Sequence, residues 1–325
     1  MRPFAYERAA DADAAVAAGA GGATYLGGGT NLVDLMKLGV ETPERLVDVS
    51  RLPHDAIEEL PGGGLRIGAA VRNSDLAVHP SVRERYPVLS QSLLAGASGQ
   101  LRNLATVGGN LLQRTRCSYF QDVTKPCNKR RPGSGCPARE GEHRNLAILG
   151  HSEHCVATHP SDMAVALTAL NATVHVHGTA GARTLSMPGF HRLPQHEPHK
   201  DTNLAPGDLV TAIELAPPDT ATTNSTYRKV RERASFSFAV ISVAAAISER
   251  NGVIEECAIA LGGVAHVPWR ASEAEATLRG MPATAESFAK AADAELARAE
   301  PLRDNAYKVP LTRNVLINTL TELSA

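Results

Sequence analysis

Short apolar segments alternate with helical patterns over the first seventy residues of the chain. Apolar runs at 23–26, 46–49 and 65–71 predict buried strands. Apolar residues at helical spacing predict helices at 11–18 and 31–38, with an aspartate placed to cap the first and a glycine at the end of the second. The pattern therefore predicts two short β-α units followed by a third strand.

The middle of the chain combines regular elements with two stretches that have no period. The predicted regular elements are helices at 74–86, 88–97 and 161–170 and strands at 172–177 and 209–215. Residues 99–113 show neither a helical nor a strand pattern. Residues 114–159 are rich in proline, glycine, lysine and arginine, and we expect them to form a long loop.

The last hundred residues are organised differently. Residues 215–226, LAPPDTATTNST, have the composition of a linker. The elements predicted after it are strands at 227–231, 238–247 and 254–261 and helices at 271–279, 284–298 and 311–323. Strands followed by helices are typical of a compact α+β domain.

Composition excludes several classes of protein. The chain of 325 residues is 43% hydrophobic and 21% charged, which is typical of a globular protein with two or three domains. A net charge of -1 and 4% aromatic residues do not favour nucleic-acid binding. No apolar run approaches the roughly 20 residues that span a bilayer, so we expect no membrane insertion. The first residues lack the apolar region of a signal peptide, so we expect no signal of the chain's own.

Two glycine-bearing segments are candidates for binding an anionic cofactor. LGGGTN (26–31, the first glycine loop) lies between a predicted strand and a predicted helix, where backbone N–H groups can face phosphate oxygens. ATVGGN (105–110, the second glycine segment) offers a hydroxyl, two glycines and an amide. Neither is a P-loop, because the chain has no Gly-Lys dipeptide. Plain turns remain the alternative for both.

LGGGTNLVDLMK, RNLATVGGNL and YRKVRER together resemble the flavin-binding medium chain of the molybdenum hydroxylases, the xanthine dehydrogenase and aldehyde oxidoreductase family. The resemblance covers essentially the whole chain. It implies an α+β protein with a two-lobed FAD-binding domain of the vanillyl-alcohol-oxidase type and a C-terminal domain of the CO dehydrogenase flavoprotein type. We expect the first lobe at 1–55, the second at 56–218 and the C-terminal domain at 224–325.

The resemblance also implies which residues contact FAD. The residues expected at the pyrophosphate are Leu26, Gly27, Gly28, Gly29, Thr30 and Asn31, and those expected on the opposite side are Thr106, Gly108, Gly109 and Asn110. Asp162 would accept hydrogen bonds from cofactor hydroxyls, although capping a helix is an equally natural role for it. Leu209 and Val210 would pack along the flavin ring. Lys229 would lie near the isoalloxazine, or else be an exposed strand residue.

Four of the five cysteines, Cys117, Cys127, Cys136 and Cys155, fall in the predicted long loop. A domain with this much core hardly needs disulfides, and the spacing fits structural zinc poorly, although His151 and His154 are further possible ligands. A [4Fe–4S] cluster is the third alternative, and wide spacing is acceptable for it.

The resemblance favours the cluster, since the loop is similar to that of a subgroup, including periplasmic aldehyde oxidoreductases, with an extra [4Fe–4S] cluster in the flavin chain. Nearby lysines and arginines would raise the potential of such a cluster. Cys257, alone in a predicted strand, is expected to be a small buried hydrophobe.

The function that the resemblance implies is electron transfer within a complex. A large subunit with the molybdenum cofactor and a small subunit with [2Fe–2S] clusters would supply electrons to FAD, and an external acceptor would remove them. The alternative is a zinc-stabilised nucleotide-binding subunit with a regulatory role. We expect a periplasmic location through co-export with a partner that carries the signal, with the cytoplasm as the alternative.

Overall fold

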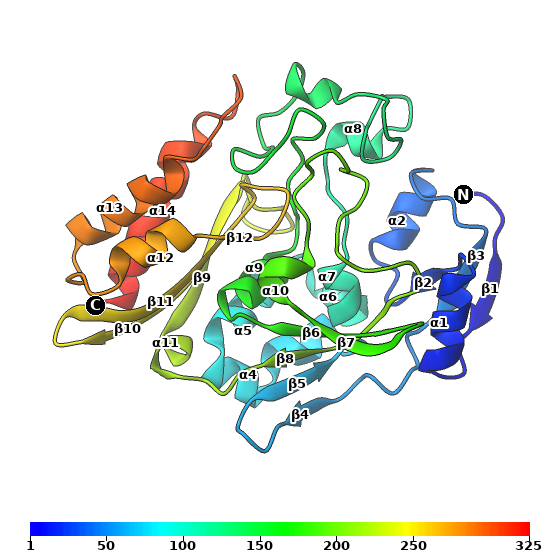
Figure 1. The fold of residues 1–325 in the computed structure, drawn as a ribbon, viewed down its shortest axis with the longest axis horizontal. Helices are drawn as coiled ribbons and strands as arrows, with labels where there is room; N and C mark the ends of the chain where they lie inside the picture. Colours follow the sequence, from blue (N-terminus) through cyan, green and yellow to red (C-terminus); the bar gives the residue numbers. More distant parts are fainter.

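Three separate sheets organise the computed structural model, which describes residues 1–325 (Figure 1). The first is a parallel sheet in the order β1-β3-β2, formed by β1 (Ala5–Arg8), β2 (Thr24–Leu26) and β3 (Arg45–Asp48). Helices α1 (Ala12–Ala20) and α2 (Leu32–Lys37) connect its strands. The side chain of Asp11 caps α1 by accepting from Ala14 N at 2.8 Å, as the sequence predicts. This sheet and its helices form the first lobe.

The second lobe is built on a five-stranded antiparallel sheet in the order β4-β5-β8-β6-β7. Its strands are β4 (Ile57–Glu59), β5 (Leu65–Gly68), β6 (Thr173–Gly178), β7 (Gly181–Ser186) and β8 (Leu209–Leu215). The helices of this lobe are α3 (Asn73–Val78), α4 (Pro80–Arg85), α5 (Pro87–Ala95), α6 (Gly99–Leu104), α7 (Val107–Leu111), α9 (Asp162–Ala169) and α10 (Met187–Phe190). A core of 29 buried residues lies between this sheet and the helices.

Two predictions about this lobe were wrong, and the linker expected after it contains some regular structure. The helix expected at 74–86 is two helices, because Pro80 cannot continue the first and starts the second. Residues 99–113 are largely helical, since the side chains of Ser98 and Thr106 cap α6 and α7. The expected linker at 215–226 contains α11 (Thr220–Thr223) and the first residues of β9.

The C-terminal domain is an antiparallel sheet covered on one face by three helices (Figure 1). The strands are β9 (Ser225–Val230), β10 (Ile241–Arg250), β11 (Val253–Gly262) and β12 (Trp269–Arg270), and the helices are α12 (Ser272–Leu278), α13 (Ala285–Leu296) and α14 (Lys308–Leu323). The helices and one face of the sheet enclose a core of 22 residues. Tyr227, Ala244 and Ala260 from the sheet belong instead to the core of the second lobe, so the two domains pack tightly.

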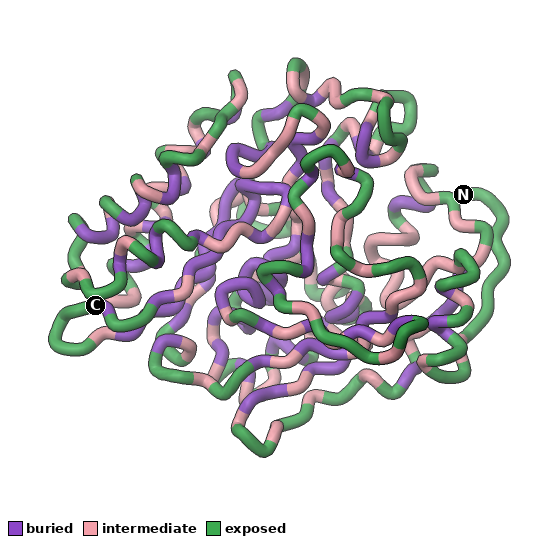
Figure 2. The backbone as a smooth tube through the Cα atoms, in the orientation of Figure 1, coloured by how far each residue is buried: buried purple, intermediate pink, exposed green.

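The segment 114–159, here named the cysteine loop, lies between the first lobe and the C-terminal domain (Figure 1). Its only regular elements are α8 (Ser118–Gln121) and a 3-10 turn at Pro137–Arg139. It has a small core that includes Leu35 of α2, and Figure 2 shows buried residues within this otherwise irregular segment. None of the helices of the protein combines the length and the hydropathy needed to cross a membrane.

Candidate functional site

The first glycine loop separates two neighbouring cavities. The larger cavity, of about 940 Å³, lies toward the C-terminal domain, and the smaller, of about 360 Å³, lies between the two lobes. Residues 28–31 and Gly109 line both cavities. An elongated ligand that passes over the first glycine loop can therefore occupy both.

Close packing explains why the loop consists of glycines. A Cβ atom on Gly28 would lie 2.0 Å from the carbonyl oxygen of Leu104, and one on Gly27 would lie 2.9 Å from the hydroxyl of Thr106. Gly29 has a φ of +73°, a conformation that a side chain would strain. The loop therefore lies directly against residues 104–106, just before the helix of the second glycine segment.

The first glycine loop presents free hydrogen-bond donors. The backbone N–H groups of residues 28–31 donate to no acceptor within the chain. The side-chain Nδ2 of Asn31 is buried without a partner, while its Oδ1 accepts from the backbone N of Arg114 at 2.9 Å. Unpaired donors cost free energy when buried, so this arrangement fits an anionic group such as a pyrophosphate.

The second glycine segment has a different role, because the backbone N–H groups of its two glycines are paired within the chain. Gly108 N donates to Ala69 O at 2.9 Å, and Gly109 N donates to the Thr106 hydroxyl at 3.2 Å. The side-chain oxygen of Asn110 accepts from Ser161 at 2.7 Å and from Gln113 at 2.7 Å. This segment is a hydrogen-bonded wall that packs against the first glycine loop. Leu26 ends β2 and lines neither cavity.

Asp162 and Lys229 lie in the larger cavity and form a buried ion pair. The distance from Lys229 Nζ to Asp162 Oδ2 is 2.8 Å, and their side chains are 3% and 8% exposed. The hydroxyl of Tyr227 donates to the other carboxylate oxygen at 2.5 Å. Burial raises the pKa of Tyr227, and the neighbouring Asp162 charge raises it further. Ser161, not Asp162, provides the side chain that caps α9.

Leu209 and Val210 lie in the smaller cavity, at the start of β8. They share it with Gly27, Thr106 and Gly108, whereas Asn110 lines only the larger cavity. The structure therefore brings all the predicted cofactor contacts except Leu26 to one of two adjoining cavities. Leu209 and Val210 line one cavity and Lys229 the other, although the sequence analysis expected all three beside the flavin ring.

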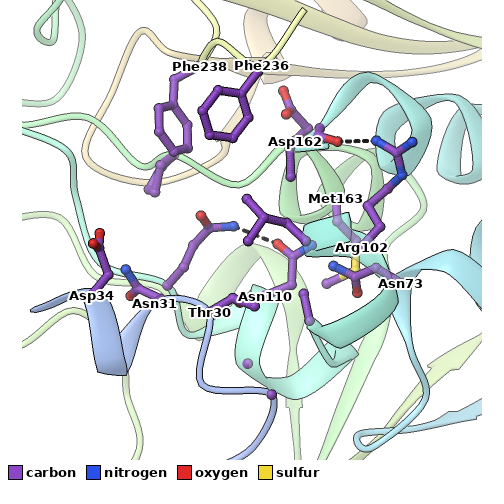
Figure 3. Close-up of a pocket in the computed structure, with 18 of the residues that line it drawn as sticks. Thr30, Asn31, Asp34, Asn73, Arg102, Asn110, Asp162, Met163, Phe236 and Phe238 are labelled. Atoms are coloured by element: carbon purple, nitrogen blue, oxygen red, sulfur yellow. Dashed lines mark hydrogen bonds between the residues drawn. The ribbon is translucent and has the colours of Figure 1, made fainter. Parts of the chain in front are cut away.

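Aromatic residues at the larger cavity escaped the sequence analysis. Figure 3 shows Phe236 and Phe238 on the side of the cavity away from Thr30 and Asn110. Both rings are about half exposed, and the guanidinium of Arg116 lies 4.9 Å from the centre of the Phe238 ring. Two phenylalanines in the segment SFSF are a usable signal in a chain with so few aromatic residues.

The four cysteines of the cysteine loop line one small cavity, here named the four-cysteine cavity. All are free thiols, so the disulfide alternative has no support in the structure. Burial raises the pKa of Cys117 to about 11 and that of Cys155 to about 12. Backbone amides oppose this effect, those of Phe120 and Tyr119 at Cys117 and that of Ala157 at Cys155.

The four-cysteine cavity does not have the close ligand geometry of a single-ion site. No three histidine, cysteine or carboxylate side chains lie close enough together to hold a single metal ion. His154 also lines the cavity, but its Nε2 lies 3.1 Å from Nδ1 of His196, and His151 Nε2 is bonded to Glu300 O at 2.7 Å. Four free thiols, two of them buried, with backbone N–H groups at three of the sulfurs, are the donor types that hold an iron–sulfur cluster.

Two family models and several known proteins are similar to this chain. Residues 2–218 match the family model for the FAD binding domain in molybdopterin dehydrogenase, and residues 225–323 match that for the CO dehydrogenase flavoprotein C-terminal domain. The aldehyde oxidoreductase FAD-binding subunit PaoB of Escherichia coli K12 is 50% identical over 329 residues, covering 100% of this chain and 99% of the relative. The glyceraldehyde dehydrogenase medium chain of Sulfolobus acidocaldarius is 30% identical over 78% of this chain and 73% of the relative.

Solved structures show the same fold. The CO dehydrogenase of Oligotropha carboxidovorans aligns with a TM-score of 0.77 over 100% of this chain and 99% of that chain, at 23% identity. The predicted α+β architecture with its two named domain types is therefore confirmed. The chain belongs to the FAD-binding medium subunits of the molybdenum hydroxylase family, which are components of oxidoreductase complexes.

Proposed function

We propose that this chain is the FAD- and [4Fe–4S]-containing electron-transfer subunit of a molybdenum-dependent aldehyde oxidoreductase. The observation that carries the proposal is that the first glycine loop, with its free donors, lies close to a cavity lined by four free cysteines. Arg114 connects the loop with this cavity. Its backbone N–H donates a hydrogen bond to the side-chain oxygen of Asn31, and its guanidinium lies over the ring of Phe120, which packs with the cysteines. The 50% identity to an aldehyde oxidoreductase subunit supports the substrate class.

FAD would extend across both cavities, with its pyrophosphate at the first glycine loop. We place its isoalloxazine in the larger cavity, beside Lys229, and its adenosine end in the smaller one, beside Leu209 and Val210. This placement differs from the expectation that Leu209 and Val210 pack along the flavin ring. When bound, the flavin supplies the chemistry that converts single-electron and two-electron transfers. The chain's own residues would hold it, and Asp162 fixes the position of the Lys229 ammonium beside it.

The four cysteines would hold the cluster as thiolates, which the positive iron ions favour against the effect of burial. A large molybdenum subunit and a small [2Fe–2S] subunit would deliver electrons, and an external acceptor would remove them from the flavin. The open side of the larger cavity, at Phe236 and Phe238, is the position where an acceptor would approach. We also propose that the complex is periplasmic through co-export with a signal-bearing partner, which cell fractionation tests.

Absorption spectroscopy and metal analysis of the purified chain test the proposal. We expect flavin bands above a broad iron–sulfur absorbance, with iron and FAD both bound. Replacing Cys127 with Ser should lower the iron content while FAD stays bound, because the cysteine lines the four-cysteine cavity and not the flavin cavities. A colourless protein that contains zinc would instead establish the zinc-stabilised nucleotide-binding alternative.

A further inference from the structure

A buried cation lies beside the four-cysteine cavity. The side chain of Lys129 is only 1% exposed, and the residue lines the cavity together with the four cysteines. The other basic side chains of this loop differ in burial, since Lys125 and Arg131 are exposed. Burial raises the pKa of the Cys155 thiol, and the charge of Lys129 is the largest of the effects that lower it. Because Lys129 and Cys155 are both buried, solvent screens this charge poorly at the Cys155 sulfur.

Lys129 is held in place by residues from a distant segment. Its Nζ donates to Pro198 O at 2.8 Å and forms an ion pair with Asp201 Oδ1. The second carboxylate oxygen of Asp201 accepts from Arg114 Nε at 2.9 Å, and Arg114 also pairs with Glu41. Lys129 and Arg114 keep the pKa of Asp201 well below its ordinary value, although burial acts in the opposite direction.

The network has an orientation. Its charges alternate from Lys129 through Asp201 and Arg114 to Glu41, so that the positive end faces the cysteines. Arg114 also links the network to the first glycine loop, because its backbone N–H donates to the side-chain oxygen of Asn31. Stability alone is a weak reason to keep such a network, because a buried ion pair is often no more stabilising than well-packed apolar residues.

We propose that Lys129 is a positioning residue that raises the reduction potential of the cluster held by the four cysteines, and that Asp201 and Arg114 fix its ammonium against them. This inference rests on the proposed function, since it needs the cluster. Four thiolates around a [4Fe–4S] core carry net negative charge, and the single electron gained on reduction adds another. A fixed ammonium stabilises the reduced form more than the oxidised form, and so raises the potential.

The test is a mediated redox titration of the purified complex. The reduced [4Fe–4S] cluster is followed by its fast-relaxing EPR signal at low temperature, which distinguishes it from [2Fe–2S] signals. Lys129→Met should shift the midpoint potential downward, and Asp201→Asn, which leaves the ammonium uncompensated, should shift it upward. Lys129→Arg should restore the potential. Lys125→Met, which removes an exposed cation from the same loop, is the matched control and should leave the potential unchanged.

Opposite shifts for the two variants cannot come from a merely structural role. Equal potentials in the wild type and Lys129→Met would overturn the inference, and so would loss of iron from both Lys129→Met and Asp201→Asn. If only Lys129→Met loses its cluster, the potential of Asp201→Asn is the test: an upward shift supports the inference, and an unchanged potential overturns it. Absence of iron from the wild-type protein is a different outcome, because it would overturn the proposed function itself.

Discussion

Replacing Gly28 with alanine tests the role of the first glycine loop. The added Cβ would lie 2.0 Å from Leu104 O, 2.8 Å from Leu104 C and 3.1 Å from Ala105 Cα. All three are backbone atoms, so no flexible side chain can move aside. The loop must shift by about 1.4 Å before the shortest of these contacts becomes ordinary.

The cost follows from the size of this shift. Overpacking of this kind costs about 1–3 kcal/mol. The free N–H groups of residues 28–31 move with the loop and lose their alignment with the ligand. Because 1.4 kcal/mol corresponds to a tenfold change in affinity, we expect FAD to bind about 10- to 100-fold more weakly.

Flavin fluorescence during titration of the deflavinated protein measures this affinity, and thermal unfolding reports stability separately. Gly99→Ala is the matched control, since a Cβ atom there has no neighbour within 4 Å. We expect the control to bind FAD as the wild type does. Unchanged affinity in Gly28→Ala, in a protein that folds normally, would refute the assignment of the loop to the cofactor.

Three further outcomes follow from buried polar groups. Lys229→Met should lower the free energy of unfolding by about 3–5 kcal/mol, because Asp162 keeps a buried charge without its cation; urea unfolding measures this, and adding Asp162→Asn should recover part of the loss. Lys308→Met should lower the free energy of unfolding by about 1–3 kcal/mol, since Nζ donates to backbone carbonyls of three residues that would lose this partner; an unchanged denaturation midpoint would contradict this. Burial lowers the pKa of His191 to about 4 and that of His266 to about 3. Below about pH 6.5 the unfolded chain binds protons that the folded chain does not, so stability should fall from pH 6.5 to pH 4; a flat profile of unfolding free energy would show that these histidines are not buried in the neutral form.

Local patterns predicted the elements that contain the site. The apolar strand before LGGGTN and the helix after it are where the sequence placed them, and Asp11 caps α1 as expected. The capped helices α6 and α7 were missed because elements of five or six residues are too short to show a period. Their signals were Ser98 and Thr106, which are good cap residues without a recognisable helix behind them.

Long-range pairing accounts for what the sequence could not show. Asp162 and Lys229 were each assigned to the cofactor, yet they are 67 positions apart in sequence and bind one another. Tyr227 lies two residues before Lys229 on the same face of β9, so the sequence analysis could have included it among the candidate site residues. Asp201 had no local signal, because its partner Lys129 lies 72 positions away and only the folded chain brings them together.

The cysteine loop also limits how this protein can be divided. Ile148 N and Leu149 N donate to Val264 O, Glu300 N donates to Ile148 O, and Lys308 spans residues 145, 146 and 263. A segment inserted in the N-terminal half is therefore anchored to the C-terminal half. A chimera joined near residue 224 from two relatives would take the loop from one protein and the residues that anchor it from the other.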